Sequence, residues 1–304
     1  MTSRSRDVDM SKKIPHIRVV SPSGAIDPAY IDGAVTRLRA WGYIVSEGAH
    51  ARDTWGRFAG TDEDRLSDLI DALRDPSVDC ILCARGGYGL QRIIDRVPPI
   101  TKPIIGFSDI TALHQWSAIS RQSSLHGIMC KHIATLPEDS EPLQMLRRAL
   151  TGETLEYRWT HHPLNQFGEA CAPIVGGNLS VLYGLQGTKF GLQNPIIRDQ
   201  FPVLLIEDIA ERHYHIDRMM RNLRMSGVLA HLSGLIVGQF SDCDDDPLMQ
   251  QTVYETIKEA VADYDYPLIF NAPIGHVEHN VPLWIHGHTS VHCGADGVLL
   301  TNRF

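Results

Sequence analysis

A serine, a glutamate and a histidine each stand where an apolar, strand-forming run gives way to other structure. Ser108 follows the run of residues 103–107 in "PIIGFSDIT", and a helix-forming stretch comes after it. Glu207 closes the apolar run "VLLIE", and His276 follows a glycine in the loop "NAPIGHVEHN". A serine can attack a carbonyl group when a histidine accepts its proton and a carboxylate orients that histidine. Because sites in open α/β sheets form at the carboxyl ends of strands, the three residues together indicate a nucleophilic site.

Ser108 alone also has a structural interpretation. Serine is a common N-cap, because its side chain accepts a hydrogen bond from the first turn of the helix. The strand, tight turn and helix around Ser108 resemble a nucleophile elbow, although Ile110 stands where G-x-S-x-G has its last glycine. A helix cap and an exposed nucleophile are therefore both open for this residue.

The glycine-rich stretch "RGGYG" at residues 85–89 also lies between a strand-forming run and a short helix. It lacks the G-x-G-x-x-G spacing and the Lys-Ser/Thr ending of nucleotide-binding loops. Glycines do leave backbone N–H groups that a ligand can approach closely. Gly86 and Gly87 are therefore candidates for an oxyanion hole, which needs such donors.

No metal or cofactor is expected from the spacing of possible ligands. The chain has 15 histidines, with H-x-H pairs at His213/His215 and His286/His288. Neither pair belongs to a His-Glu-x-x-His pattern, and "CDDD" at residues 243–246 lacks the spacing of a calcium loop.

The composition is that of a globular protein with one large or two medium domains. Of the 304 residues, 43 % are hydrophobic and 21 % are charged, and the net charge is −8. That charge disfavours a phosphate-binding surface, so we expect no nucleic-acid partner. No apolar run approaches the roughly 20 residues of a membrane span, and the polar start has no signal-like apolar region. We therefore expect a cytoplasmic protein without a membrane partner.

Six cysteines in a chain of this length do not suggest a disulfide framework. Cys80 and Cys83 form a C-x-x-C within the β-forming run "VDCILCA". On a strand these two positions face opposite sides of the sheet, so a structural role is expected.

Strands and helices alternate in the first half of the chain, which predicts βαβ units and a mostly parallel sheet. The first expected strand lies in 16–24 and ends in a Ser/Pro/Gly loop, and the others are 43–48, 78–84 and 103–108. The expected helices are 28–42, 61–75, 90–96 and 109–120. Thr61 and Asp64 predict a capping box at the start of the second helix.

The alternation of strands and helices stops after a helix at 142–150, because residues 151–171 show no periodic spacing of apolar residues. We expect an N-terminal α/β domain at 14–150, a linker at 151–171 and a C-terminal domain at 172–304. The C-terminal domain is predicted to be mixed α/β as well, with helices at 176–188, 213–227 and 249–264 and strands at 201–208, 234–240, 267–270, 288–293 and 297–301.

The chain resembles the LD-carboxypeptidases, a family of serine peptidases. The resemblance runs from about residue 20 to residue 287, nearly the whole chain, and its motifs occur in the family's order. They are "SPSG", "RFAGTDEDRLSDL", "ARGGYG", "GFSDIT", "VGGNLSVL", "LIEDIAERHYHIDRMMRNLRMSGVL", "GLIVGQFSDC" and "APIGHVEHN".

The resemblance implies an N-terminal domain similar to class I glutamine amidotransferases, joined to a C-terminal swivelling-type α/β domain. It identifies Ser108 as the nucleophile, Glu207 as the orienting acid and His276 as the base. Gly275, His276 and Asn280 keep the family pattern G-H-x-x-x-N, which favours His276 over the nearby His279.

The backbone N–H groups of Asp109 and of Gly86 or Gly87 would then hold the oxyanion. Arg85 is the candidate closest in sequence to these donors for binding a terminal carboxylate, a role that suits arginine. Arg85 could equally be part of a structural ion pair.

The implied substrate is the murein tetrapeptide, from which the enzyme would remove the terminal D-Ala during cytoplasmic recycling. The resemblance also implies a homodimer. Two rival functions are a related acyl hydrolase that cleaves peptide-nucleotide antibiotics and a catalytically inactive relative that binds ligand.

Overall fold

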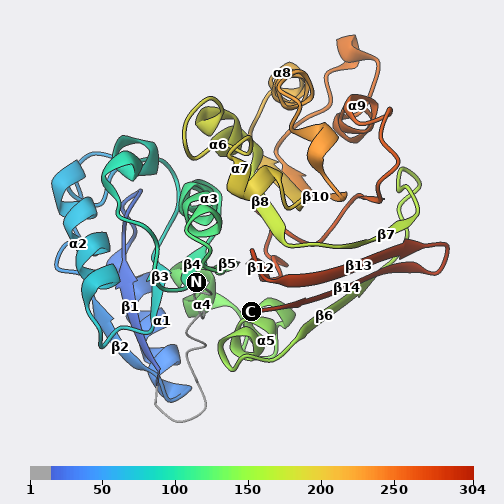
Figure 1. Ribbon diagram of the computed structural model, residues 1–304. Coiled ribbons are helices and arrows are strands. Elements are labelled where there is room, and N and C mark those ends of the chain that lie inside the picture. The colour runs from blue at the N-terminus through green and yellow to red at the C-terminus, as the bar shows by residue number, and fades with distance from the viewer. Residues whose placement is uncertain (1–14) are drawn as a thin grey trace, which may run out of the picture.

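The computed structural model describes residues 15–304, and its first half is built on a six-stranded sheet (Figure 1). The strand order is β12-β5-β4-β3-β1-β2, and all neighbours are parallel except β12 and β5, which are antiparallel. The strands are β1 (His16–Val20), β2 (Ile44–Glu47), β3 (Cys80–Cys83), β4 (Ile104–Gly106), β5 (Ser124–His126) and β12 (Leu283–Ile285). The expected mixed α/β class and parallel first sheet are confirmed.

Helices cover this sheet on its two faces. They are α1 (Pro28–Ala40), α2 (Asp62–Arg74), α3 (Thr111–Ile119), α4 (Cys130–Thr135) and α5 (Glu141–Leu150), with 3-10 turns η1 (Leu90–Arg92), η2 (Ile94–Arg96) and η3 (Ser108–Ile110). Thr61 and Asp64 form the predicted capping box of α2. The α2 residues Leu66 and Leu69 pack with Cys83, whereas Cys80 packs in the core that contains α1. The two cysteines thus face opposite sides, as predicted, and burial raises the pKa of the Cys80 thiol to about 12.

A second, parallel sheet with the order β11-β10-β9-β8 forms the centre of the other half. Its strands are β8 (Ile174–Asn178), β9 (Val203–Ile209), β10 (Gly234–Ser241) and β11 (Leu268–Ile269). The helices and 3-10 turns of this half are α6 (Leu179–Leu185), α7 (Pro195–Arg198), α8 (His213–Met225), α9 (Val253–Ala260), η4 (Leu229–His231) and η5 (Pro247–Met249). The apolar stripe of α8 is buried against its neighbours, as its helical spacing requires.

A third sheet is antiparallel, with the order β6-β14-β13-β7. Its strands are β6 (Leu155–Trp159), β7 (Gly168–Cys171), β13 (His288–Gly294) and β14 (Gly297–Arg303). The segment 151–171, interpreted above as a linker, therefore contributes two strands. Leu155 and Tyr157 are buried while Glu156 and Arg158 are exposed, a period of two that is too short to stand out in the sequence.

Two further features differ from the expectation. Gly176 and Gly177 lie in strand β8 instead of opening a helix, which begins only after Asn178. A Cβ atom at Gly176 would lie 2.2 Å from the carbonyl oxygen of Leu205, so the glycine permits close strand contact.

Strand β12, near the end of the chain, returns to the first sheet beside β5, and the two halves therefore share a sheet. No helix within residues 15–304 is long and apolar enough to span a membrane.

Candidate active site

Ser108 lies on a strained turn at the carboxyl end of β4. Its φ angle of 66° places a non-glycine residue in the left-handed region, which is uncommon. Ser108 is the first residue of η3, and no described side chain caps either η3 or α3. Its side chain is partly exposed, and its hydroxyl makes no hydrogen bond with another residue of the described range. The geometry is that of an exposed elbow and lacks the hydrogen bond of a helix cap.

Glu207 and His276 form a buried pair in the second half. Glu207 Oε2 lies 2.7 Å from Nδ1 of His276. The Glu207 side chain is completely buried, whereas 15 % of the His276 side chain is exposed. A Cβ atom at Gly275 would lie 3.1 Å from Glu207 Oε2, so the glycine before the histidine makes room for the carboxylate. The expected contact between these two side chains is therefore present.

The backbone around His276 is held by its neighbours. Asn280 accepts a hydrogen bond from the Gly275 N–H at 3.0 Å, and Ser241 donates its hydroxyl hydrogen to the His276 carbonyl oxygen at 2.9 Å. Asn280 is completely buried, which gives the G-H-x-x-x-N pattern a physical reason. The amide side chain closes the loop that presents the imidazole.

The electrostatic environment of His276 suits a base that must bind a proton during a reaction. Burial lowers the pKa of His276, but the hydrogen bond and the negative charge of Glu207 raise it more, so the pKa is above its usual value. The adjacent Asp208 serves another purpose, because its carboxylate accepts hydrogen bonds from Asn178 Nδ2 and from the Ser180 N–H, both at 2.8 Å. Burial and the charge of Glu207 raise the pKa of Asp208 to about 7.

Glu207 is positioned slightly differently from the expectation. It does not close β9, because the strand continues to Ile209. Glu207 instead points to the His276 side of the strand, while the next residue, Asp208, accepts a hydrogen bond from the Ser180 N–H in the first turn of α6 on the other side.

The two halves meet beside Ser108. The ring of Phe107, the residue before the serine, packs edge-on against the His276 ring with a centroid distance of 5.0 Å. Thr111 Oγ1, three residues after the serine, accepts a hydrogen bond from the Asn178 N–H at 2.9 Å. No hydrogen bond joins Ser108 and His276 among the residues described, and the packing of Phe107 on the His276 ring is the contact that brings the serine turn beside the histidine.

The glycine loop lies against the elbow. A Cβ atom at Gly86 would be 2.7 Å from Ser108 Cβ, so only glycine fits there. Gly87 has a φ angle of 101°, and Gly86 accepts a hydrogen bond from the Gly24 N–H at 3.0 Å. Arg85 is exposed and donates to the Ala25 carbonyl oxygen at 2.5 Å, so its partner is the backbone rather than an acidic side chain.

His279 is directed elsewhere, as its Nε2 lies 2.8 Å from the Glu141 carboxylate on the surface. One group of described side chains has the spacing of metal ligands: His50, Asp53 and Asp64. His50 pairs with Asp53 at 2.8 Å and Asp64 caps α2, so these contacts already account for the group.

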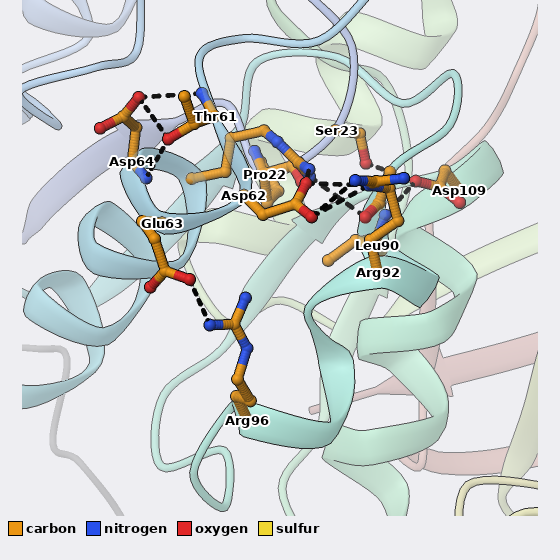
Figure 2. Close-up of polar contacts among 12 residues, drawn as sticks. Pro22, Ser23, Thr61, Asp62, Glu63, Asp64, Leu90, Arg92, Arg96 and Asp109 are labelled. Carbon is orange, nitrogen blue, oxygen red and sulfur yellow. Dashed lines mark hydrogen bonds and ion pairs between the residues drawn. The ribbon is translucent and has the colours of Figure 1, made fainter.

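Sequence reasoning missed a buried polar network behind the elbow. The sequence points to Asp109 only for its backbone N–H, but its carboxylate is buried and accepts hydrogen bonds from Ser23 and Leu90 (Figure 2). An acidic residue inside the apolar stretch "IIGFSDI" is the one signal that could have indicated a buried role.

Comparison with known proteins gives consistent matches. The N-terminal domain model of the LD-carboxypeptidases matches residues 17–127, and the C-terminal domain model matches residues 172–291. The chain is 32 % identical to the "Probable murein peptide carboxypeptidase" of Bacillus subtilis, over 86 % of this chain and 83 % of the relative. It is 29 % identical to the murein tetrapeptide carboxypeptidase of Pseudomonas aeruginosa, over 96 % of this chain and 97 % of the relative.

Solved structures share the fold. Muramoyltetrapeptide carboxypeptidase from Oxalobacter formigenes superposes with a TM-score of 0.82 at 23 % identity, covering 95 % of this chain and 99 % of the other. The microcin C7 self immunity protein MccF, in complex with aspartyl sulfamoyl adenosine, superposes with a TM-score of 0.81 at 19 % identity, covering 96 % of each chain.

Proposed function

Because the chain belongs to the LD-carboxypeptidase family, we propose that it is a serine peptidase that releases the terminal D-Ala from the murein tetrapeptide. The observation that carries the proposal is the 2.7 Å contact between Glu207 and His276, beside a serine on a strained elbow. Ser108, His276 and Glu207 are the proposed nucleophile, base and orienting acid.

In the proposed reaction His276 Nε2 takes the hydroxyl proton as Ser108 Oγ attacks the carbonyl carbon before D-Ala. Glu207 holds Nδ1–H, which leaves Nε2 free to accept that proton, and its charge stabilises the imidazolium that forms. His276 then gives the proton to the leaving amine of D-Ala. Water hydrolyses the acyl-enzyme by the same steps and regenerates Ser108.

This mechanism requires Ser108 Oγ and His276 to come into hydrogen-bond contact when substrate binds. Catalytic hydrogen bonds are often long before substrate arrives, and the packing of Phe107 on His276 already keeps the two residues close. The backbone N–H groups of Asp109 and of Gly86 or Gly87 are the proposed oxyanion donors, because the glycine loop lies against the Ser108 side chain.

The substrate assignment is supported by the two murein peptide carboxypeptidases among the relatives. An exopeptidase must also bind a free carboxylate, and Arg85 remains the proposed ligand for it. Arg85 would have to exchange its hydrogen bond to the Ala25 carbonyl for that contact, which its exposure permits.

We also propose that the enzyme is a homodimer and acts in the cytoplasm, in the recycling of peptidoglycan peptides. Five of its six free cysteines are buried thiols, a pattern compatible with a reducing compartment. Light scattering of the purified protein and fractionation of cells test these two points.

The deciding experiment is mass spectrometry of the murein tetrapeptide before and after incubation with the enzyme. We expect the loss of one D-Ala with the wild type and no turnover with Ser108→Ala, which should remain folded because it loses only an unbonded hydroxyl. Substantial D-Ala release by folded Ser108→Ala would reject the serine mechanism. An aminoacyl sulfamoyl nucleoside, offered in parallel, distinguishes the antibiotic-cleaving alternative, and inertness toward both substrates would favour the inactive relative.

A further inference from the structure

A buried polar network joins the turn after Ser108 to two other loops, and Figure 2 shows its contacts between Asp109, Ser23 and Leu90. Asp109 Oδ2 accepts two hydrogen bonds, from Ser23 Oγ at 2.5 Å and from the Leu90 N–H at 2.9 Å. Ser23 is completely buried and Asp109 is 3 % exposed. The residue that follows the proposed nucleophile is thus bound both to the loop after β1 and to the end of the glycine loop.

Arg65 strengthens the same connection from helix α2. Its side chain is completely buried, and Nη1 donates to the Pro22 carbonyl oxygen at 2.7 Å and to the Gly89 carbonyl oxygen at 3.1 Å. Its second terminal nitrogen, Nη2, is paired with Asp62. Arg65 therefore joins the same two loops that Asp109 joins.

The network surrounds two buried charges. Burial raises the pKa of Asp109, while the hydrogen bonds from Ser23 and Leu90 and the charge of Arg65 oppose that rise. Burial likewise lowers the pKa of Arg65, and Asp62 and Asp109 oppose this. Desolvation offsets much of the attraction between buried charges, so such a network is weak evidence for added stability. The geometry that it imposes is the better reason for its presence.

That geometry concerns the oxyanion donors. One proposed donor is the backbone N–H of Asp109, and the other belongs to Gly86 or Gly87 in the loop that ends at Gly89 and Leu90. The φ angle of 66° at Ser108 is strained, and such conformations persist only where the surroundings hold them. The Asp109 carboxylate holds the segment directly after this strained residue and fixes it to the glycine loop.

Resting on the proposed function, we propose that Asp109 and Arg65 are positioning residues, whose side chains fix the spacing between the two oxyanion donors. Neither side chain needs to touch the substrate. Their removal should therefore weaken transition-state stabilisation and leave substrate binding nearly unchanged.

The principal variant is Asp109→Ala, which removes both hydrogen bonds between the elbow and the two loops. A donor displaced by about 1 Å can cost about 100-fold in rate, so we expect kcat to fall about 100-fold with KM changed less than about threefold. The rate at which a fluorophosphonate labels Ser108 should fall in parallel, because its adduct uses the same donors without any peptide.

Two milder variants make the test specific. Asp109→Asn keeps an oxygen that can accept both hydrogen bonds, so kcat should stay within about tenfold of the wild type. Ser23→Ala removes one hydrogen bond only, so its fall in kcat should lie between those of Asp109→Asn and Asp109→Ala. If Asp109→Ala does not fold, the kcat of Ser23→Ala tests the positioning role instead. Glu63→Gln is the matched control, because Glu63 pairs with Arg96 on the exposed side of α2, and wild-type kcat is expected (Figure 2).

A merely structural network gives a different result. Asp109→Ala and Ser23→Ala would then have lower melting temperatures but wild-type kcat and labelling rates in the folded fraction, which would overturn the proposal. If the wild type is labelled at Ser108 but releases no D-Ala, the proposed substrate is wrong. The labelling rates of the wild type and the variants then test the positioning role by themselves. A wild type that shows neither labelling nor release would overturn both proposals.

Discussion

Replacement of Glu207 by glutamine tests the proposed triad most directly. The substitution keeps the shape of a completely buried side chain and removes the charge that lies 2.7 Å from His276 Nδ1. The second carboxylate oxygen, Oε1, has no hydrogen-bond partner within residues 15–304, so the glutamine amide group can take that place without breaking another contact. The local structure should therefore survive the change.

The expected loss follows from the charge of the imidazolium that forms during attack. Two unit charges about 4 Å apart attract each other by about 4 kcal/mol at an effective dielectric constant of about 20. Since about 1.4 kcal/mol corresponds to a factor of ten, kcat should fall about 1000-fold. KM should change little, because the His276 imidazole separates the buried Glu207 carboxylate from the substrate.

The pH profile gives a second, independent readout. His276 acts as a base only when it is neutral, so activity is lost as the pH falls through its pKa. Although burial lowers this pKa, Glu207 raises it above the usual value for histidine, about 6.5. The acid limb of kcat/KM should thus lie above about pH 6.5 in the wild type and move to lower pH in Glu207→Gln.

The assay is D-Ala release across a pH series, with thermal unfolding to show that the variant is folded. The matched control is Glu211→Gln, because Glu211 forms a surface pair with His215 at 3.0 Å and should not affect kcat. A folded Glu207→Gln enzyme with wild-type kcat, or with an unmoved acid limb, would refute the assignment of the orienting acid.

Three further predictions concern the base, the glycine loop and metal ions. His279→Ala should retain wild-type kcat, because His279 pairs with Glu141 on the surface, while His276→Ala should lose nearly all activity; the reverse result would show that the base is misassigned. Gly86→Ala should abolish Ser108 labelling by a fluorophosphonate, because the new Cβ would lie 2.7 Å from Ser108 Cβ, and wild-type labelling would contradict this close packing. Dialysis against a strong chelator should leave the rate of D-Ala release unchanged, and a loss that zinc restores would contradict the metal-free mechanism.

Features that depend on residues close together in the chain could be predicted before the fold was known. Thr61 and Asp64 are three residues apart and cap α2, and the apolar spacing of residues 216–223 places one face of α8 in the core. Apolar runs located β1, β3, β4, β9 and β10, and the immediate neighbours of Ser108 predicted its turn after β4. Each of these signals acts within one or two turns of backbone, so it is visible in the sequence.

The meeting of distant residues could not be predicted from such local signals. The contact between Glu207 and His276 was expected only because both residues follow strand-forming runs and because the chain resembles a family of serine peptidases. Glu207 and His276 are 69 residues apart, and only the packing of β9 beside β10 and the loop after β11 brings their side chains together. The strand at Ile174–Asn178 was missed because its glycines are explained by the close approach of Leu205 and Thr111, residues from other elements. The return of β12 to the first sheet and the buried contacts of Asp109 were hidden for the same physical reason. Burial and hydrogen bonding are properties of a residue's neighbours in space, and those neighbours are set by the packing of the whole chain.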